Sequence, residues 1–255
     1  MKTRSVCKMR KKKGMVKQLM YKILEAKELT TNIYSMVVEA PRVAKNCQPG
    51  QFVIVRMDKD GERIPLTICD YDREKGTVTI VFQTVGAETT RMAVLKTGDS
   101  FHDFVGPLGC ASEMVGEDKE ALAKKKILFV AGGVGTAPVY PQVKWLHKNG
   151  IAADVIVGAK NQELLILEKE MEAVAGNLYV TTDDGSYGRK GMVTQTIQEL
   201  VDEGRKYDLC IAIGFRLTIV GIPNSFVSLQ TNFIMIIGPI AIHRSYFLPS
   251  STSSC

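Results

Sequence analysis

Residues 127–140 read ILFVAGGVGTAPVY, and this stretch decides the fold of the second half of the chain. A continuous apolar run leads into Gly132, Gly133 and Gly135, and Pro138 follows where a helix would take its first turn. Strand, glycine loop and helix in this order are typical of the first unit of a parallel α/β sheet. Such a loop lets a pyrophosphate approach the backbone and the first helical amides, whereas glycines alone also serve tight turns. Its place on the first strand of the sheet favours dinucleotide binding.

The chain downstream of this loop keeps alternating between strand and helix patterns. The expected strands are 127–133, 153–160, 178–184 and 209–214, and the expected helices are 137–150, 163–175 and 192–204. Alternation of this kind predicts a doubly wound parallel sheet.

The chain upstream has a different rhythm. Short alternating or β-branched runs, separated by Pro-Gly, Asp-Gly and Lys-Gly turns, predict strands at 21–29, 32–40, 50–57, 64–71 and 77–85. Strands at this spacing predict a small antiparallel barrel. One brief helix is expected over 89–99, and its first residues, Thr89 and Thr90, are able to cap it or to meet a phosphate.

These patterns divide the chain into five segments. We expect a basic extension at 1–19, a barrel at 20–109, a charged linker at 110–126, an α/β domain at 127–214 and an atypical tail at 215–255. The predicted fold is therefore an antiparallel β-barrel domain followed by a doubly wound α/β domain with a parallel sheet.

The distribution of charge argues against nucleic acid as a partner. Of the formal net charge of +6, residues 1–19 contribute +8, which leaves −2 for residues 20–255. The basic run has no apolar segment behind it and is not a secretory signal. We interpret it as a disordered extension ahead of a start at Met15 or Met20, with a basic docking arm as the alternative.

Cysteine usage and hydropathy indicate a cytoplasmic protein without a membrane span. The six cysteines are scattered and form no C-x-x-C pair, a pattern that suits buried free thiols in a reducing compartment and offers no metal site. They are Cys7, Cys47, Cys69, Cys110, Cys210 and Cys255. The best apolar run, 233–242, is only about half as long as a membrane span requires.

A second candidate site is RIPLTICDYD at residues 63–72, on a barrel strand. Arg63 can pair with phosphate, Pro65 and Leu66 present apolar backbone, and Thr67 offers a hydroxyl. A flavin ring requires backbone donors and acceptors along its edge, a hydroxyl near its reactive nitrogen and a cation for its phosphates. A plain barrel strand with an exposed arginine is the alternative.

A third candidate is TTDDGSYGRKG at residues 181–191, which follows the third strand of the parallel sheet. Ligands of open α/β sheets bind at the carboxyl ends of the strands, so this loop and the glycine loop are expected to face one crevice. Ser186, Arg189 and Lys190 could hold a ribose phosphate there, and Asp184 and Gly185 of the same loop are further candidates for cofactor binding. Solvated charges on a turn are the alternative, and on the loop alone we favour it. Together with Lys160, the cations give a slight preference for NADP over NAD.

These motifs, in this order, resemble the ferredoxin–NADP+ reductase family over about residues 20–214. The likeness is carried by Arg-x-Pro-Leu-Thr in the barrel, GPLG at 106–109 and Gly-Gly-Val-Gly-Thr-Ala-Pro in the sheet. Within the family the motifs are most similar to the alpha subunit of NADH-dependent reduced ferredoxin:NADP+ oxidoreductase, and next to the dihydroorotate dehydrogenase electron-transfer subunit. The resemblance implies FAD in the barrel, NADP(H) or NAD(H) on the sheet, and a [2Fe-2S] cluster on C-terminal cysteines.

The resemblance also implies roles for individual residues. Arg63, Pro65, Leu66 and Thr67 match the flavin motif, Gly86, Thr89 and Thr90 match the phosphate-side loop, and Gly132, Gly133, Gly135, Thr136 and Pro138 match the nucleotide loop. The implied reaction is hydride transfer between a nicotinamide and the flavin, with Thr67 beside the reactive nitrogen. The implied partners are ferredoxin and a larger subunit that carries flavin and iron–sulfur groups.

The tail departs from the family pattern. Residues 215–255 contain no Asp, Glu or Lys and a single cysteine, Cys255, whereas a [2Fe-2S] cluster takes four ligands. We favour a shifted reading frame after Gly214. The alternatives are a divergent ending that still packs as the last helix and strand, and a family member that needs no cluster. A shifted frame would leave strand 209–214 as an exposed sheet edge.

Three functions remain in competition. The first is an FAD-dependent electron-transfer subunit that exchanges hydride with NAD(P)H, and the second is the electron-transfer subunit of dihydroorotate dehydrogenase. The third, from another class, is an inactive nucleotide-binding relic with a frameshifted C-terminus.

Overall fold

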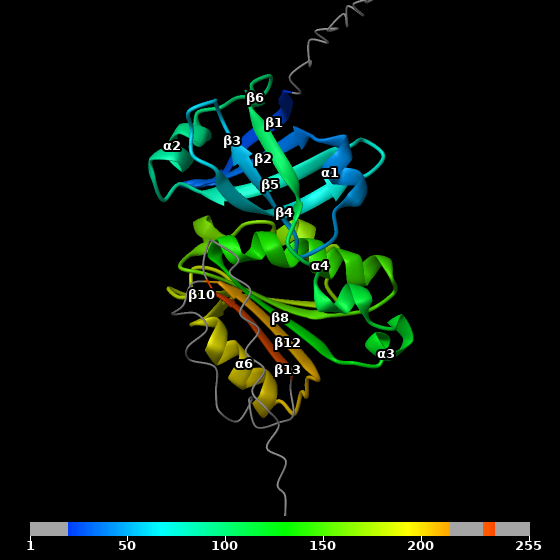
Figure 1. The fold of residues 1–255 in the computed structure, drawn as a ribbon. Coiled ribbons are helices and arrows are strands. Elements are labelled where there is room, and N and C mark those ends of the chain that lie inside the picture. Colours follow the sequence, from blue (N-terminus) through cyan, green and yellow to red (C-terminus); the bar gives the residue numbers. More distant parts are fainter. Residues whose placement is uncertain (1–19, 215–231, 238–255) are drawn as a thin grey trace, which may run out of the picture.

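Two sheets, one antiparallel and one parallel, organise the molecule. The structure is a computed structural model that describes residues 20–214 and the backbone of residues 232–237. Figure 1 shows the antiparallel sheet stacked above the parallel one, with helix α4 lying between them. This arrangement confirms the predicted fold class.

The antiparallel sheet curls into a nearly closed barrel. Its order is β6-β1-β2-β5-β4-β3-β7. Only His102 separates β6 from β7, yet β6 pairs with β1 and β7 pairs with β3, so the two ends of the sheet meet at this bend. The strands are β1 Tyr21–Thr30, β2 Ile33–Glu39, β3 Phe52–Arg56, β4 Ile64–Asp72, β5 Thr77–Gln83, β6 Ser100–Phe101 and β7 Asp103–Leu108.

Alternation along these strands fills the barrel. Ile23, Val38, Val53, Ile80 and Phe101 are fully buried and belong to one core cluster inside it. Burial of large apolar side chains of this kind contributes roughly 1.5–3 kcal/mol each.

Two short helices accompany the barrel strands. α1 (Pro41–Asn46) has proline at its first position, where the missing N–H costs nothing, but six residues are too few to give a periodic signal in the sequence. α2 (Ala87–Ala93) begins two residues earlier than the sequence predicts, with Gly86 as its N-cap.

The parallel sheet has the order β11-β10-β9-β8-β12-β13. The strand order therefore reverses between β8 and β12, and a ligand crevice is expected at the carboxyl ends of these two strands. The strands are β8 Ile127–Gly132, β9 Asp154–Ala159, β10 Asn177–Thr182, β11 Arg189–Lys190, β12 Leu209–Gly214 and β13 Asn232–Ile237.

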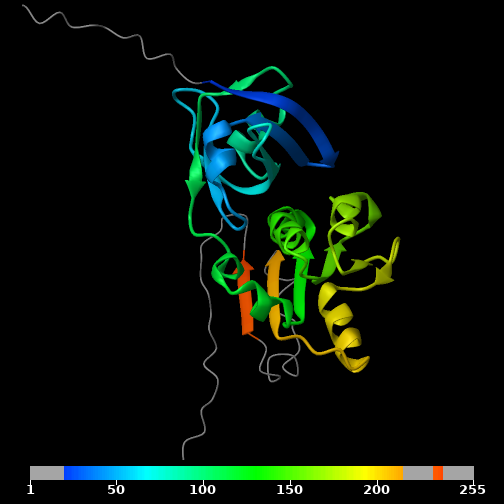
Figure 2. The same ribbon diagram turned by 90° about the vertical axis from the view of Figure 1, so that its right-hand side faces the viewer.

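Helices cover both faces of this sheet. α4 (Thr136–Lys148) packs with Phe129 of β8 on one face, and α6 (Val193–Asp202) packs with Leu128 and Val130 on the other. Figure 2 shows the sheet between these helices. The remaining elements are α3 Lys119–Ala123, α5 Glu168–Glu172 and the 3-10 turns η1 Glu113–Gly116, η2 Gly133–Gly135 and η3 Gln162–Leu164.

One predicted helix is much shorter than expected. The pattern at 163–175 predicts a continuous helix, but the structure has η3, a break, and then α5. The break occurs because Leu167 adopts a left-handed conformation with φ of 57°, while the preceding Ile166 is buried in the core. Tertiary packing thus overrides a favourable helical sequence.

The expectation of an exposed edge at 209–214 is wrong. β13 pairs with β12 in parallel register from Leu209 with Asn232 to Gly214 with Ile237, so β12 lies inside the sheet. The shifted frame and the cluster ligands concern the tail, of which the structure describes only the backbone of residues 232–237, and the basic extension at 1–19 lies outside the described residues.

Two further features bear on the chemistry. Among the four cysteines in the described residues, Cys47, Cys69 and Cys210 are buried, Cys110 is exposed, and all are free thiols. No helix in the same part of the chain has both the length and the apolar character that crossing a membrane demands.

Candidate functional site

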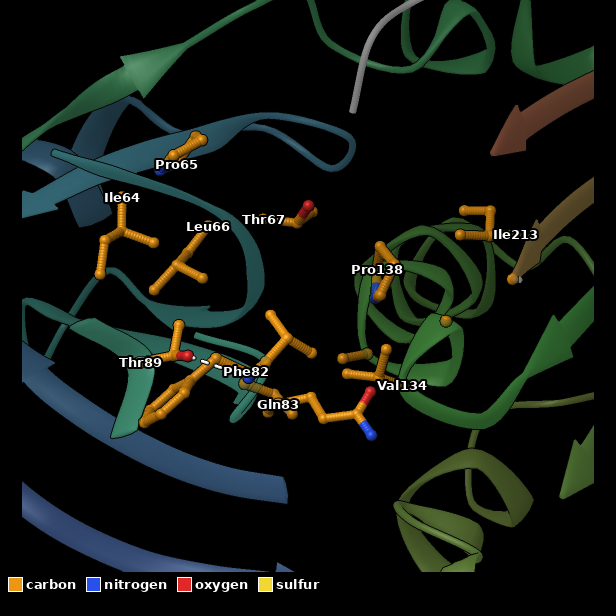
Figure 3. Close-up of a pocket in the computed structure, with 15 residues that line it drawn as sticks. Ile64, Pro65, Leu66, Thr67, Phe82, Gln83, Thr89, Val134, Pro138 and Ile213 are labelled. Carbon is orange, nitrogen blue, oxygen red and sulfur yellow. Dashed lines mark hydrogen bonds between the residues drawn. The ribbon is translucent and has the colours of Figure 1, made fainter. Parts of the chain in front are cut away.

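A cleft of about 220 Å³ lies where the barrel meets the parallel sheet. Figure 3 shows residues from β4, β5 and the turn before α2 on one side, and residues from the glycine loop and the end of β12 on the other. The lining residues are Ile64, Pro65, Leu66, Thr67, Val81, Phe82, Gln83, Val85, Thr89, Val134, Gly135, Ala137, Pro138, Ile213 and Gly214. No acidic or basic side chain is among them, so the described walls suit a flat, uncharged ring.

The barrel wall offers two polar side chains. Thr67 lies in the middle of β4, and Figure 3 shows it facing Pro138 across the cleft. Gln83 ends β5 and lines the same space. Neither side chain hydrogen-bonds to any other residue in the part of the chain that the structure describes, so both can serve a ligand.

Two threonine hydroxyls hold the turn before α2. Thr89 accepts hydrogen bonds from the backbone amides of Val85 (3.0 Å) and Gly86 (3.1 Å), and its hydroxyl donates to the carbonyl of Gly86 (3.0 Å). The hydroxyl of Thr90 donates to the same carbonyl (2.9 Å). Both threonines therefore shape the loop through their own hydrogen bonds.

The opposite wall depends on a close backbone contact. A Cβ atom at Gly135 would stand 2.3 Å from the carbonyl oxygen of Ile213, so glycine lets the turn after β8 lie against the end of β12. Gly133 has φ of 56°, a left-handed conformation that favours glycine, with open space where a Cβ would stand. The hydroxyl of Thr136 donates to the carbonyl of Gly133 (2.9 Å) and tightens the turn from within.

The loop at 183–191 follows β10 at the same edge of the sheet as the glycine loop. One of its cations already has acidic partners. Arg189 forms ion pairs with Glu199 on α6 (2.6 Å) and with Glu203 just after this helix (3.8 Å). The backbone amide of Ser186 donates to Asp184 (2.9 Å), and hydrogen bonding from Ser186 lowers the pKa of Asp184. Lys190, like Lys160 after β9, forms no ion pair among the described residues.

The structure brings together six of the residues singled out in the sequence: Pro65, Leu66, Thr67, Thr89, Gly135 and Pro138 all line the cleft. The others lie outside its lining: Arg63, Gly86, Thr90, Gly132, Gly133, Thr136, Asp184, Gly185, Ser186, Arg189 and Lys190. Arg63 is exposed just before β4. Sequence reasoning missed Gln83, Val134 and Ile213, and the last two were signalled only by their places beside the glycines at two strand ends.

No cluster of possible metal ligands accompanies the cleft. Within residues 20–214, no three His, Cys, Asp or Glu side chains gather in a way that could hold a metal ion. Cys255, the one cysteine of the tail, lies outside the described residues.

Comparison with curated proteins finds relatives over about three quarters of the chain. An uncharacterized protein from the adh 3' region of Clostridium beijerinckii is 62% identical over 196 residues, covering 76% of this chain and 66% of the relative. The dihydroorotate dehydrogenase B (NAD(+)) electron transfer subunit homolog of Thermotoga maritima is 38% identical over 192 residues, covering 75% and 65%. The chain thus spans just under two thirds of these two relatives.

A third relative is matched over more of its length. The dihydroorotate dehydrogenase B (NAD(+)) electron transfer subunit of Shouchella clausii is 34% identical over 194 residues, covering 75% of this chain and 71% of the relative. No family model matches the chain.

Among solved structures, an NADH-dependent reduced ferredoxin-NADP oxidoreductase, described in connection with flavin-based electron bifurcation, superposes with a TM-score of 0.77. It is 32% identical, and the match covers 89% of this chain and 79% of that one. The match covers enough of this chain to include both the barrel and the parallel sheet.

Proposed function

Since the chain belongs to the ferredoxin–NADP+ reductase family, with dihydroorotate dehydrogenase B electron transfer subunits among its relatives, we propose that it is an FAD-dependent electron-transfer subunit. In this proposal it oxidises NADH or NADPH and passes the electrons to a larger partner subunit or to ferredoxin. We propose barrel, linker and nucleotide domains at 20–109, 110–126 and 127–214, and a cytoplasmic location.

One observation carries the proposal. The cleft joins Thr67 of the barrel to Gly135 and Pro138 of the parallel sheet, although about 70 residues separate these motifs in the sequence. A reaction between two flat rings requires two binding surfaces that face each other at close range. The arrangement of the two motifs supports such a reaction.

The residues of the cleft fit a flavin ring. Its walls carry no charge, and Thr67 and Gln83 keep hydrogen-bonding groups that no described residue uses. Thr67 and the backbone of β4 would hold the edge of the ring, and the amides at the start of α2 and the Arg63 side chain would meet the phosphates. When bound, FAD supplies the chemistry that links a two-electron donor to one-electron acceptors.

The chain's own part in this reaction is positional. No described side chain at the cleft is an acid or a base, and a hydride step needs neither. The residues would instead align the nicotinamide with the ring and exclude water from between them. The glycine loop and the loop at 183–191 would hold the nucleotide, because both lie at the carboxyl edge of the sheet.

Of the three cations that the sequence suggests for binding the extra phosphate of NADP, fewer are available in the structure. Arg189 is paired with two glutamates, so Lys160 and Lys190 are the cations we propose for a 2'-phosphate. This pairing weakens the case for NADP, and either nucleotide agrees with the proposal.

The test is direct. The purified full-length chain is reconstituted with FAD, and anaerobic flavin bleaching is followed after mixing with NADH and with NADPH. We expect bound flavin and rapid bleaching by at least one nucleotide. Bound flavin that neither nucleotide reduces would support the inactive relic instead.

A second candidate is the electron-transfer subunit of dihydroorotate dehydrogenase, favoured by the names of the relatives from Thermotoga maritima and Shouchella clausii. The two candidates share the flavin chemistry and differ in the partner. Copurification of a dihydroorotate-oxidising subunit would support the second, and copurification of a subunit that reacts with ferredoxin would support the first.

A further inference from the structure

An ion pair joins the barrel to the parallel-sheet half. Lys144 on α4 places its Nζ 2.7 Å from Oδ1 and 2.6 Å from Oδ2 of Asp70 on β4. The two side chains are only 24% and 29% exposed. The other ion pairs formed by the described residues lie within one half or within the linker. α4 and β4 also form the most extensive contact across the boundary between the two halves.

A local irregularity in β4 brings Asp70 to this place. The register between β4 and β5 shifts between Ile68 and Asp70. Ile68 is buried in the barrel core, whereas Cys69 is buried in the core of the other half. Regular alternation would return Asp70 to the side of Ile68, and a β-bulge re-aims the strand at this point. The bulge thus turns a carboxylate out of the barrel and towards α4.

Lys144 is held from its own helix as well. Its Nζ lies 5.4 Å from the centre of the Tyr140 ring, one turn earlier on α4, and Tyr140 is itself in the core. Burial alone would lower the pKa of Lys144, but the hydrogen bonds and charge of Asp70 outweigh it, and the net shift is upward. Lys144 is therefore charged in the neutral pH range.

The ion pair lies at nearly the same distance from the cleft along β4 as along α4. Asp70 follows Thr67 by three residues, or about 10 Å along a strand. Lys144 follows Pro138 by six residues, or about 9 Å along a helix. Thr67 and Pro138 face each other across the cleft, as Figure 3 shows. One end of the β4–α4 contact is therefore fixed by the ion pair, and the other end forms the cleft.

From this geometry we infer that Asp70 and Lys144 are positioning residues that set the separation between the flavin strand and the nucleotide helix. The inference rests on the proposed function and deepens it. The pair does not touch the reacting groups; it holds β4 and α4 at the spacing that ring-to-ring transfer requires. Reactions of this kind lose rate steeply when the reacting atoms are displaced by about 1 Å.

The test compares Asp70→Asn, Lys144→Met, the double variant and Asp70→Glu in the full-length chain. In both single variants we expect the limiting rate of flavin reduction to fall about tenfold to a hundredfold, with nucleotide affinity and flavin content nearly unchanged. The double variant should be no slower than the worse single variant, because both remove one interaction. Asp70→Glu keeps the charge and should recover most of the rate.

A second measurement, amide hydrogen exchange, does not depend on turnover. Amide hydrogen exchange in residues 65–72 and 138–148 should be faster in Asp70→Asn and Lys144→Met than in the wild type, with and without FAD. Asp72→Asn is the matched control, since Asp72 lies on the same strand and forms an exposed pair with Lys75 at 3.3 Å. The Asp72→Asn variant should leave the rate of flavin reduction and the amide exchange unchanged.

Wild-type rates and exchange in both single variants, or additive losses of rate in the double variant, would overturn the inference. If the wild type binds FAD but neither nucleotide reduces it, the proposed function fails. Amide exchange then still decides whether the pair holds the two halves together.

Discussion

At the scale of single residues, the candidate site depends on hydroxyl groups whose partners differ. Thr67 has a hydroxyl that no described residue uses, whereas the hydroxyl of Thr89 makes three contacts with the backbone of the turn before α2. The first is available to a ligand, and the second is structural. The two threonines therefore call for different experiments.

Replacing Thr67 by valine should slow flavin reduction while FAD stays bound. Valine keeps the shape but removes the one hydroxyl of β4 that faces Pro138, and loss of one positioned hydrogen bond typically costs about 0.5–1.5 kcal/mol, or up to about tenfold in rate. Stopped-flow reduction of the reconstituted chain measures this, with Thr67→Ser as the control that keeps the hydroxyl. An unchanged rate in Thr67→Val would show that the hydroxyl of Thr67 takes no part in flavin reduction.

Replacing Thr89 by alanine should lower the stability of the barrel by about 1–2 kcal/mol, in the range measured for capping side chains. The amides of Val85 and Gly86 would lose their acceptor beside the cleft. Urea unfolding measures the change, and Thr89→Ser should remain close to the wild type. Equal stability of the alanine and serine variants would show that the hydroxyl does not hold the turn.

At the scale of elements, the glycine loop both packs against the end of β12 and lines the cleft. Gly135→Ala would bring a methyl group against the carbonyl of Ile213, and neither backbone can yield without separating β8 from β12. We expect a loss of about 1–3 kcal/mol in the free energy of unfolding, as in other overpacked sites. Gly116→Ala is the control, because nothing lies within 4 Å of its Cβ position. A Gly135→Ala variant as stable as that control would contradict the close contact.

The elements also show what the sequence could and could not predict. Strands that alternate, and strands followed by a long amphipathic helix, were predicted because each carries its own periodic signal. α1 was missed because six residues give no period, and the helix at 163–175 was overextended because the buried Ile166 and left-handed Leu167 reflect tertiary packing. The bulge that redirects Asp70 leaves no trace in composition. The same limit applied to the site, where Gln83 and Ile213 join the cleft only through the meeting of the two halves.

At the scale of the whole molecule, the ion pair, the cleft and the shared core make the two halves one unit. Ile33, Cys69 and Val81 of the barrel belong to the same buried cluster as Phe129 and Val143 of the other half. The hydroxyl of Thr30 also donates a hydrogen bond to the carbonyl of Glu163 across this boundary. We expect the two halves to unfold in one transition, because these barrel side chains are buried in the core of the other half, and thermal unfolding followed by calorimetry measures this.

The buried thiols predict how the stability of this unit depends on pH. Burial raises the pKa of Cys47 to about 11 and raises that of Cys69 and Cys210 further. A raised pKa means that the folded state holds its proton more tightly than the unfolded chain, whose thiols titrate near about 8.5. The stabilisation is therefore fully present below that pH and is lost as the pH rises towards 11 and beyond.

Urea unfolding under reducing conditions should show a falling midpoint above about pH 9. Cys210→Ala should flatten this fall, because it removes one of the three thiols that are buried among the described residues. A midpoint that stays constant to pH 11 in the wild type would contradict the burial of these thiols.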